Sequence, residues 1–233
     1  MKFIAHRGAC LEETEDTLAS LLRAASYGAY AVECDPRFTK DGKLVIFHDD
    51  NLKRLAGDPA RVIDLDYADM KSRLASKNLA LTTFDEVLRD YTGASAVLFD
   101  LSFDATDPEF FKLLRDAPFR AIAGVHDPKE AEAARKYLPA EDVLAFMPRP
   151  SMAEDFHEAG CGILRLWEHW LTDVAPADVR RRVGETEVWI MAHDPTVLHP
   201  LFSMNGSPAS IEKVKALGAD GILLNDIRMA MAH

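Results

Sequence analysis

The sequence predicts a TIM-type (β/α)8 barrel, a closed sheet of parallel strands surrounded by helices. Short apolar runs alternate with amphipathic stretches along the chain, and this alternation is typical of a parallel sheet covered by helices. Several runs are apolar at nearly every position, as expected for strands buried on both faces. The length of 233 residues suits one barrel, since such barrels run to roughly 250 residues. We therefore expect a single α/β domain over residues 1–233.

Eight strands are expected, with helices between them. The strands are Phe3–His6, Tyr30–Asp35, Ala96–Leu101, Phe119–Val125, Val143–Phe146, Gly162–Leu166, Glu187–Ala192 and Gly221–Leu224, and Leu44–His48 is a further extended run. Helical spacing is found at Thr17–Ser26, Thr83–Arg89, Pro128–Tyr137, Met152–Ala159, Pro176–Val183 and Ile211–Leu217. Thr83 is an expected N-cap, with Glu86 at the spacing of a capping box. The long loop Asp194–Ser207 follows the seventh strand, and it is either a lid over the site or a tolerated surface insertion.

Composition limits the partners and the location of the protein. The formal net charge of -11 argues against nucleic acid as a partner, because phosphate neutralisation needs clustered Lys and Arg. An anionic small-molecule substrate would have to be held by local cations. The three cysteines show no pairing pattern, and no signal segment or membrane-spanning run is evident. We expect a cytoplasmic protein without membrane insertion, and the sequence does not indicate an oligomeric state.

Acidic side chains stand at the carboxyl ends of neighbouring strands, where barrel enzymes carry their reactive groups. Glu33 and Asp35 are two residues apart on one strand, so they point to the same face of the sheet. If they point inward, they repel each other unless a cation lies between them. Asp100 could add a further oxygen ligand, and oxygen ligands suit Mg²⁺ or Ca²⁺. The alternative is that the pair points outward as solvated surface acids.

Two histidines and an arginine accompany these carboxylates. His6 and His48 each end an extended run, and two histidines beside a metal could act as general acid and general base in phosphoester cleavage. Arg7 can bind two phosphate oxygens with its planar guanidinium, or it can form an ion pair with Glu33 or Glu15.

Five ordered motifs resemble the glycerophosphodiester phosphodiesterase family. They are His6-Arg7-Gly8-Ala9, Glu15-Asp16-Thr17, Val32-Glu33-Cys34-Asp35, Thr39-Lys40-Asp41-Gly42 and Phe47-His48-Asp49, and weaker likeness continues through Thr82–Leu88, Val188-Trp189 and Gly218–Ile222. Five motifs in one order are far more specific than any single motif. The resemblance implies a β/α barrel that uses one divalent cation, Mg²⁺ or Ca²⁺, to cleave a small-molecule glycerophosphodiester into glycerol 3-phosphate and an alcohol.

The resemblance also assigns roles to residues. His6 and His48 would be the catalytic acid–base pair, and Arg7 and Trp189 would bind the substrate and its phosphate. Glu33, Asp35 and Asp100 would be metal ligands, and Glu15 would line the metal site or orient its neighbours. The chain departs from the family pattern at several positions. Asp16 replaces Asn, Asp100-Leu101-Ser102 replaces Glu-x-Lys, Trp189-Ile190-Met191-Ala192 replaces Trp-Thr-Val-Asn, and Asn225 replaces Thr-Asp.

Two other functions are compatible with the same residues. The first is a phosphodiester lyase, or a phospholipase C- or D-like enzyme, in which a hydroxyl of the substrate attacks phosphorus and a cyclic phosphate results. The second is a binding protein that inherited the barrel without catalysis, since a fold alone does not determine function. The presence of both histidines and of Glu33 and Asp35 favours catalysis.

Overall fold

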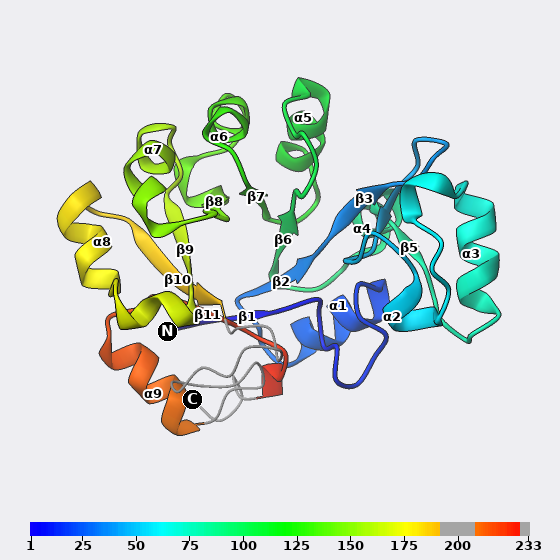
Figure 1. Ribbon diagram of the computed structural model, residues 1–233, viewed down its shortest axis with the longest axis horizontal. Coiled ribbons are helices and arrows are strands. Elements are labelled where there is room, and N and C mark those ends of the chain that lie inside the picture. The colour runs from blue at the N-terminus through cyan, green and yellow to red at the C-terminus, as the bar shows by residue number, and fades with distance from the viewer. Residues whose placement is uncertain (192–207, 229–233) are drawn as a thin grey trace.

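The computed structural model describes residues 1–191 and 208–228, and its centre is a closed barrel of eight parallel strands (Figure 1). The strands follow one another around the barrel in the order β1-β2-β6-β7-β8-β9-β10-β11. Their bounds are β1 Lys2–Ala5, β2 Ala31–Cys34, β6 Ala96–Asp100, β7 Ala121–Val125, β8 Val143–Ala145, β9 Ile163–Trp167, β10 Glu187–Met191 and β11 Gly221–Leu224. The predicted barrel and its eight strands are thus confirmed. The loop Asp194–Ser207, and with it the lid hypothesis, lies outside the described residues.

Helices surround the strands of the barrel, as Figure 1 shows. The α-helices of the described residues are α1 Leu18–Ser26, α2 Lys53–Ala56, α3 Tyr67–Ala75, α4 Phe84–Asp90, α5 Pro108–Arg115, α6 Pro128–Ala134, α7 Ala153–Glu158, α8 Pro176–Val183 and α9 Pro208–Ala216, of which α2 and α3 lie beside the barrel. All six predicted helices are present, whereas α2, α3 and α5 were not expected. The capping box of α4 is confirmed, because the side chain of Thr83 accepts from the backbone N–H of Glu86 and the Glu86 carboxylate accepts from that of Thr83.

The extended run at Leu44–His48 lies outside the barrel. It forms β4 (Leu44–Ile46) of a three-stranded antiparallel sheet, between β3 (Pro36–Phe38) and β5 (Thr82–Thr83). This sheet stands beside the barrel with α2 and α3, at the right of Figure 1. The chain makes this excursion between β2 and β6, so it leaves the carboxyl end of β2 and carries His48 on it. His48 therefore does not end a strand of the barrel.

Side chains of the strands alternate between two hydrophobic layers. One layer fills the barrel and includes Ile4, Leu98 and Trp189, while the other packs the outer faces of the strands against the helices and includes Cys34. The interior layer gives way to His6, Glu33 and Asp35 at the carboxyl ends of the strands, and all three are buried. Burial of such polar groups needs partners or ligands.

Two expectations about the environment of the protein can be compared with the structure. Cys10, Cys34 and Cys161 are free thiols. Among the described residues, no helix has both the length and the apolar character required to cross a membrane. The single-domain organisation over residues 1–233 and the cytoplasmic location stay predictions from the sequence.

Candidate active site

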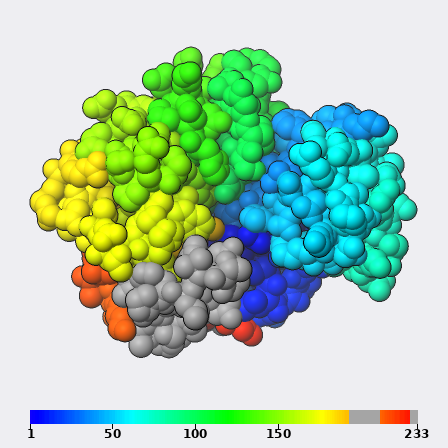
Figure 2. All heavy atoms as spheres, in the orientation of Figure 1, coloured from blue at the N-terminus to red at the C-terminus, as the bar shows by residue number. Residues whose placement is uncertain are grey.

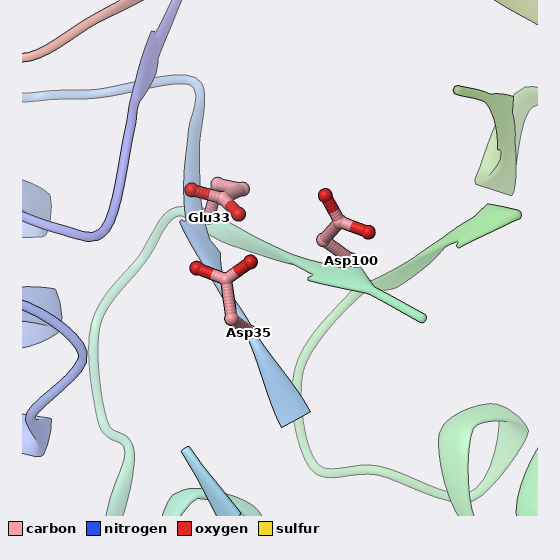
Figure 3. A group of neighbouring side chains, drawn as sticks. All are labelled: Glu33, Asp35 and Asp100. Atoms are coloured by element: carbon pink, nitrogen blue, oxygen red, sulfur yellow. The ribbon is translucent and has the colours of Figure 1, made fainter. Parts of the chain in front are cut away.

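Three carboxylates converge at the carboxyl end of the barrel. Glu33 and Asp35 project from the end of β2, and Asp100 projects from the end of the neighbouring strand β6 toward them (Figure 3). One oxygen atom from each lies within 4.8 Å of the others, a separation that lets one cation contact all three. Glu33 and Asp35 are 1% and 4% exposed, so they are not the solvated surface acids of the alternative interpretation. The structure therefore brings together these three predicted metal ligands.

Burial and mutual repulsion raise the pKa values of two of these carboxylates. Burial first, and then the charges of Asp35, Asp16 and Asp100, raise the pKa of Glu33. Burial and the charge of Asp100 raise the pKa of Asp35 to about 6. The Oδ2 atom of Asp35 has no hydrogen-bond partner in the described part of the chain, although the Arg7 Nε atom lies 3.8 Å away. Oxygen atoms that are buried, crowded and incompletely bonded fit a hard divalent cation.

The segment after β1 places His6 beside this group. His6 is buried, and its Nδ1 atom lies 2.7 Å from the Oδ1 atom of Asn225, at the end of β11. Since a carbonyl oxygen only accepts, Nδ1 carries the hydrogen and Nε2 keeps its lone pair. Burial and the nearby charge of Arg7 lower the pKa of His6 to about 3. His6 is thus uncharged at neutral pH and can accept a proton.

A strained turn follows His6. Arg7 has a φ of 56°, and this left-handed conformation turns its backbone N–H toward Glu33, whose Oε2 atom accepts it at 2.7 Å. Gly8 has a φ of 73°, and a Cβ atom there would come within 2.5 Å of the Ser20 hydroxyl. The glycine of the first motif is therefore required by a close approach to α1.

His48 reaches the site from the sheet outside the barrel. Its side chain is 40% exposed, and its Nδ1 atom lies 2.7 Å from the Oδ1 atom of Asp49. The guanidinium of Arg37, on β3, donates to the backbone carbonyl of His48 at 2.5 Å and to that of Phe47 at 3.3 Å. These contacts orient the ring and fix the backbone that carries it.

Glu15 lies in an ion-pair network and does not join the three carboxylates. Its Oε1 atom accepts from Arg7 at 3.1 Å, and its two oxygens accept from Arg54 at 2.5 and 2.8 Å. Arg54 also donates to both oxygens of Asp49, at 2.8 and 3.2 Å, so it links Glu15 to the partner of His48. This placement shows the ion pair that we considered between Arg7 and Glu15, and it favours the prediction that Glu15 orients its neighbours.

A polar pocket of about 440 Å³ opens over these groups. It lies where the β3–β4 segment (blue) adjoins the segment that follows β6 (green), two neighbouring parts of the face seen in Figure 2. The residues that line it are Asp35, Arg37, His48, Asp49, Asp50, Asn51, Asp100, Ser102 and His126. Four of the nine are aspartates, so an anionic substrate needs a cation in this pocket.

Two residues near the pocket were not identified from the sequence. His126 directly follows β7, and its Nε2 atom lies 2.5 Å from the Oδ1 atom of Asp100. Although burial opposes the shift, the hydrogen bond to Asp100 raises the pKa of His126. The sequence did offer a signal for His126, because it directly follows a strand, as His6 does. Arg165 is the only charged residue of the apolar strand β9, and this interruption of the apolar pattern was a second signal.

Trp189 is not brought together with the other predicted site residues. It is fully buried inside the barrel, and its indole N–H donates to Glu187 at 2.8 Å, at the beginning of β10. Its ring contacts Tyr30, which precedes β2. Trp189 thus points toward the amino ends of the strands, away from the pocket at their carboxyl ends.

Comparison with known proteins agrees with this geometry. The sequence pattern of the Glycerophosphoryl diester phosphodiesterase family matches residues 6–138, more than half of the chain. The chain belongs to this family. The matched range includes His6, Glu33, His48 and Asp100, and it ends before Arg165.

Individual members of the glycerophosphoryl diester phosphodiesterase family resemble the chain over different lengths. A lysophospholipase D of Homo sapiens is 35% identical over 79 residues, which are 34% of this chain and 25% of the human protein. The first curated relatives are thus matched over about a quarter of their length or less.

Solved structures of the family share the fold at low sequence identity. A putative glycerophosphodiester phosphodiesterase from Galdieria sulphuraria superposes with a TM-score of 0.77 at 15% identity, over 100% of this chain and 98% of that one. An Oleispira antarctica phosphodiesterase, in complex with the product sn-glycerol-3-phosphate, superposes with a TM-score of 0.70 at 18% identity, over 100% and 96%.

Asp16, which stands where the family has Asn, yields a prediction about stability. It is 2% exposed, and its Oδ1 atom accepts from the backbone N–H of Asp35 at 3.2 Å, whereas its Oδ2 atom has no hydrogen-bond partner among residues 1–191 and 208–228. Burial and the charge of Asp35 raise its pKa well above the ordinary value. Folding therefore favours the protonated acid, and stability is lost as the pH rises above the ordinary pKa of Asp toward the raised one.

We expect Asp16→Asn to raise the midpoint of thermal unfolding at pH 8 in the presence of chelator, because the amide keeps the Oδ1 acceptor and carries no charge. The gain should shrink at pH 5, where Asp16 is closer to neutral. Scanning calorimetry of both proteins at the two pH values measures this difference. A variant that unfolds below the wild-type protein at pH 8 would contradict the assignment of Asp16 as a buried acid.

Proposed function

We propose that this protein is a metal-dependent phosphodiesterase that hydrolyses a glycerophosphodiester to glycerol 3-phosphate and an alcohol. The observation that carries the proposal is the convergence of Glu33, Asp35 and Asp100 beside His6, with His48 in the same pocket as Asp35 and Asp100. Membership of the family supports this reaction type. The Oleispira antarctica structure, with its product sn-glycerol-3-phosphate, supports the glycerol phosphate half of the substrate.

Glu33, Asp35 and Asp100 would hold one divalent cation, Mg²⁺ or Ca²⁺. When bound, the cation supplies positive charge that polarises the phosphoryl group and offsets the negative charge of the transition state. Arg7 has a buried Nε atom without a hydrogen-bond partner among the residues that the structure describes, and it would hold a phosphoryl oxygen beside the cation. Glu15 and Arg54 orient the groups on either side of this position.

The two histidines would move the protons of the reaction. His6 is uncharged at neutral pH and its Nε2 atom keeps a lone pair, so it would take up a proton from the attacking water, although the lowered pKa makes it a weaker base than a free imidazole. The water oxygen forms a bond to phosphorus as the phosphorus–oxygen bond to the alcohol breaks. His48 lies in the open pocket, oriented by Asp49, and suits protonation of the departing alcohol oxygen.

The reaction can be tested by its phosphorus product. With glycerophosphocholine or another glycerophosphodiester and Mg²⁺ or Ca²⁺, we expect ³¹P NMR to show glycerol 3-phosphate, with ¹⁸O incorporated from labelled water. Chelator should abolish turnover, because the three carboxylates then repel the anionic substrate. A cyclic glycerol phosphate as the final product would instead identify a lyase. No turnover on any glycerophosphodiester would leave the binding-protein alternative.

If His6 and His48 carry out the acid–base steps, replacing either one should lower activity while the protein stays folded. His6→Ala and His48→Ala should each lower kcat by roughly a hundredfold to ten-thousandfold, the usual contribution of such groups. His157→Ala, on the outer helix α7, is a matched control and should keep wild-type kcat. Circular dichroism checks that each variant keeps its fold. Near-normal turnover of the His6 or His48 variant would remove that residue from the chemistry.

A further inference from the structure

Arg165 is a charged side chain buried inside the barrel, near the carboxyl ends of the strands. It lies on β9, is 3% exposed, and faces inward between the interior residues Ile163 and Trp167. Its guanidinium lies 4.1 Å from the Trp167 ring centroid and 5.6 Å from that of Trp170, which follows the strand. The side chain therefore points toward the carboxyl ends of the strands, where the candidate site lies.

The guanidinium of Arg165 has unmet hydrogen-bonding capacity. Within residues 1–191 and 208–228, its Nε and Nη1 atoms are buried and have no hydrogen-bond partner; burial lowers its pKa and the charge of Asp100 acts to raise it, but Arg165 and Asp100 form no ion pair. The rings of Phe146, Trp167 and Trp170 attract the guanidinium by cation–π interaction, but they do not replace the hydrogen bonds that a carboxylate would accept from its N–H groups. Leaving a buried charge unpaired is costly, so the fold retains Arg165 at the expense of stability.

The position of Arg165 relates it to the candidate site. In the closed barrel of eight strands, β9 is four strands away from β2 in either direction, so Arg165 lies opposite the strand that carries Glu33 and Asp35. A chain of contacts also connects it with Asp100. The guanidinium lies 5.2 Å from the Phe146 ring, which stacks on His126 at 5.2 Å, and His126 contacts Asp100.

We propose that Arg165 binds an anionic phosphoryl oxygen of the substrate, across the barrel from the three carboxylates. This inference deepens the proposed function and rests on it for the identity of the substrate. Guanidinium nitrogens with open N–H groups are matched in geometry and charge to phosphate oxygens. Arg165 would supply from β9 the positive charge that Ser102 cannot supply from the end of β6, where the family pattern has lysine.

A neutral or cationic ligand fits this position less well. The positive charge of Arg165 would repel a quaternary ammonium group from the rings of Trp167 and Trp170, although aromatic rings alone would attract one. Burial lowers the pKa of Arg165 to about 9, so the group still carries its charge at neutral pH. The open N–H groups thus select an anion.

The test compares phosphate affinity with stability in Arg165→Met, which keeps a long apolar side chain but removes the charge. With Mg²⁺ in excess, calorimetric titration of inorganic phosphate should show affinity about tenfold to a hundredfold lower than wild type, as expected for loss of hydrogen bonds to a charged group. Arg165→Lys should recover part of the affinity. Arg115→Met, at the exposed end of α5, is the matched control and should bind phosphate as the wild-type protein does.

Stability distinguishes a ligand-binding role from a structural one. Without phosphate, Arg165→Met should unfold at a temperature equal to or above that of the wild-type protein, because it removes an unpaired buried charge. Wild-type phosphate affinity in Arg165→Met would overturn the proposal, and so would a wild-type protein that binds no phosphate. If Arg165→Met does not fold, Arg165→Gln replaces it in the same titration, with the same outcomes.

Substrate assays separate this inference from the proposed function. If the wild-type protein cleaves no glycerophosphodiester but its phosphate affinity still depends on Arg165, only the proposed function fails. If it does cleave them, Arg165→Met should raise KM for glycerophosphocholine and glycerophosphoserine alike. An effect confined to glycerophosphoserine would mean that Arg165 binds the carboxylate of the alcohol group. This result would overturn the proposal that Arg165 binds a phosphoryl oxygen.

Discussion

The repulsion among Glu33, Asp35 and Asp100 is the constraint on which the rest of the site depends. A closed barrel aims the carboxyl ends of its strands at one region, so acids on adjacent strands are forced together and away from water. Positive charge must offset them, and the protein supplies part of it through Arg7, whose backbone and side chain both contact the group. We propose that a divalent cation supplies the remainder, which would convert an unstable arrangement into a binding site for anionic phosphate.

The barrel and its acidic centre could be predicted from the sequence because both follow from short-range patterns. Buried parallel strands appear in the sequence as apolar runs, and all eight strands of the barrel were predicted from such runs. The two-residue spacing of Glu33 and Asp35 places them on one face of a strand, but it left open whether that face points into the barrel or to solvent. His6 was found for the same reason, since it directly follows a strand. In each case a local rule of geometry determines where the side chain goes.

Other features depend on contacts between distant segments, which such patterns do not contain. Leu44–His48 is an apolar run like those of the barrel strands, and only its pairing with Pro36–Phe38 and Thr82–Thr83 shows that it lies outside the barrel. Glu15 shares a motif with site residues, yet its partner Arg54 lies 39 positions away and draws it into an ion pair. Arg165 interrupts an apolar strand in the sequence, but only the structure shows that its Nε and Nη1 atoms lack a hydrogen-bond partner among the described residues.

The central claim, that a divalent cation resolves the repulsion among the three carboxylates, is tested most directly by calorimetric titration of chelator-treated protein with Mg²⁺ and with Ca²⁺. At pH 7.5 the account predicts one bound cation per chain. Because the pKa of Asp35 is raised to about 6, protons compete below that pH, so affinity should fall markedly at pH 5. Glu33→Gln should weaken binding at pH 7.5, whereas Asp104→Asn, which removes an exposed acid from the loop after β6, should not. Absence of binding at pH 7.5, or binding that Glu33→Gln leaves unchanged, would contradict the account.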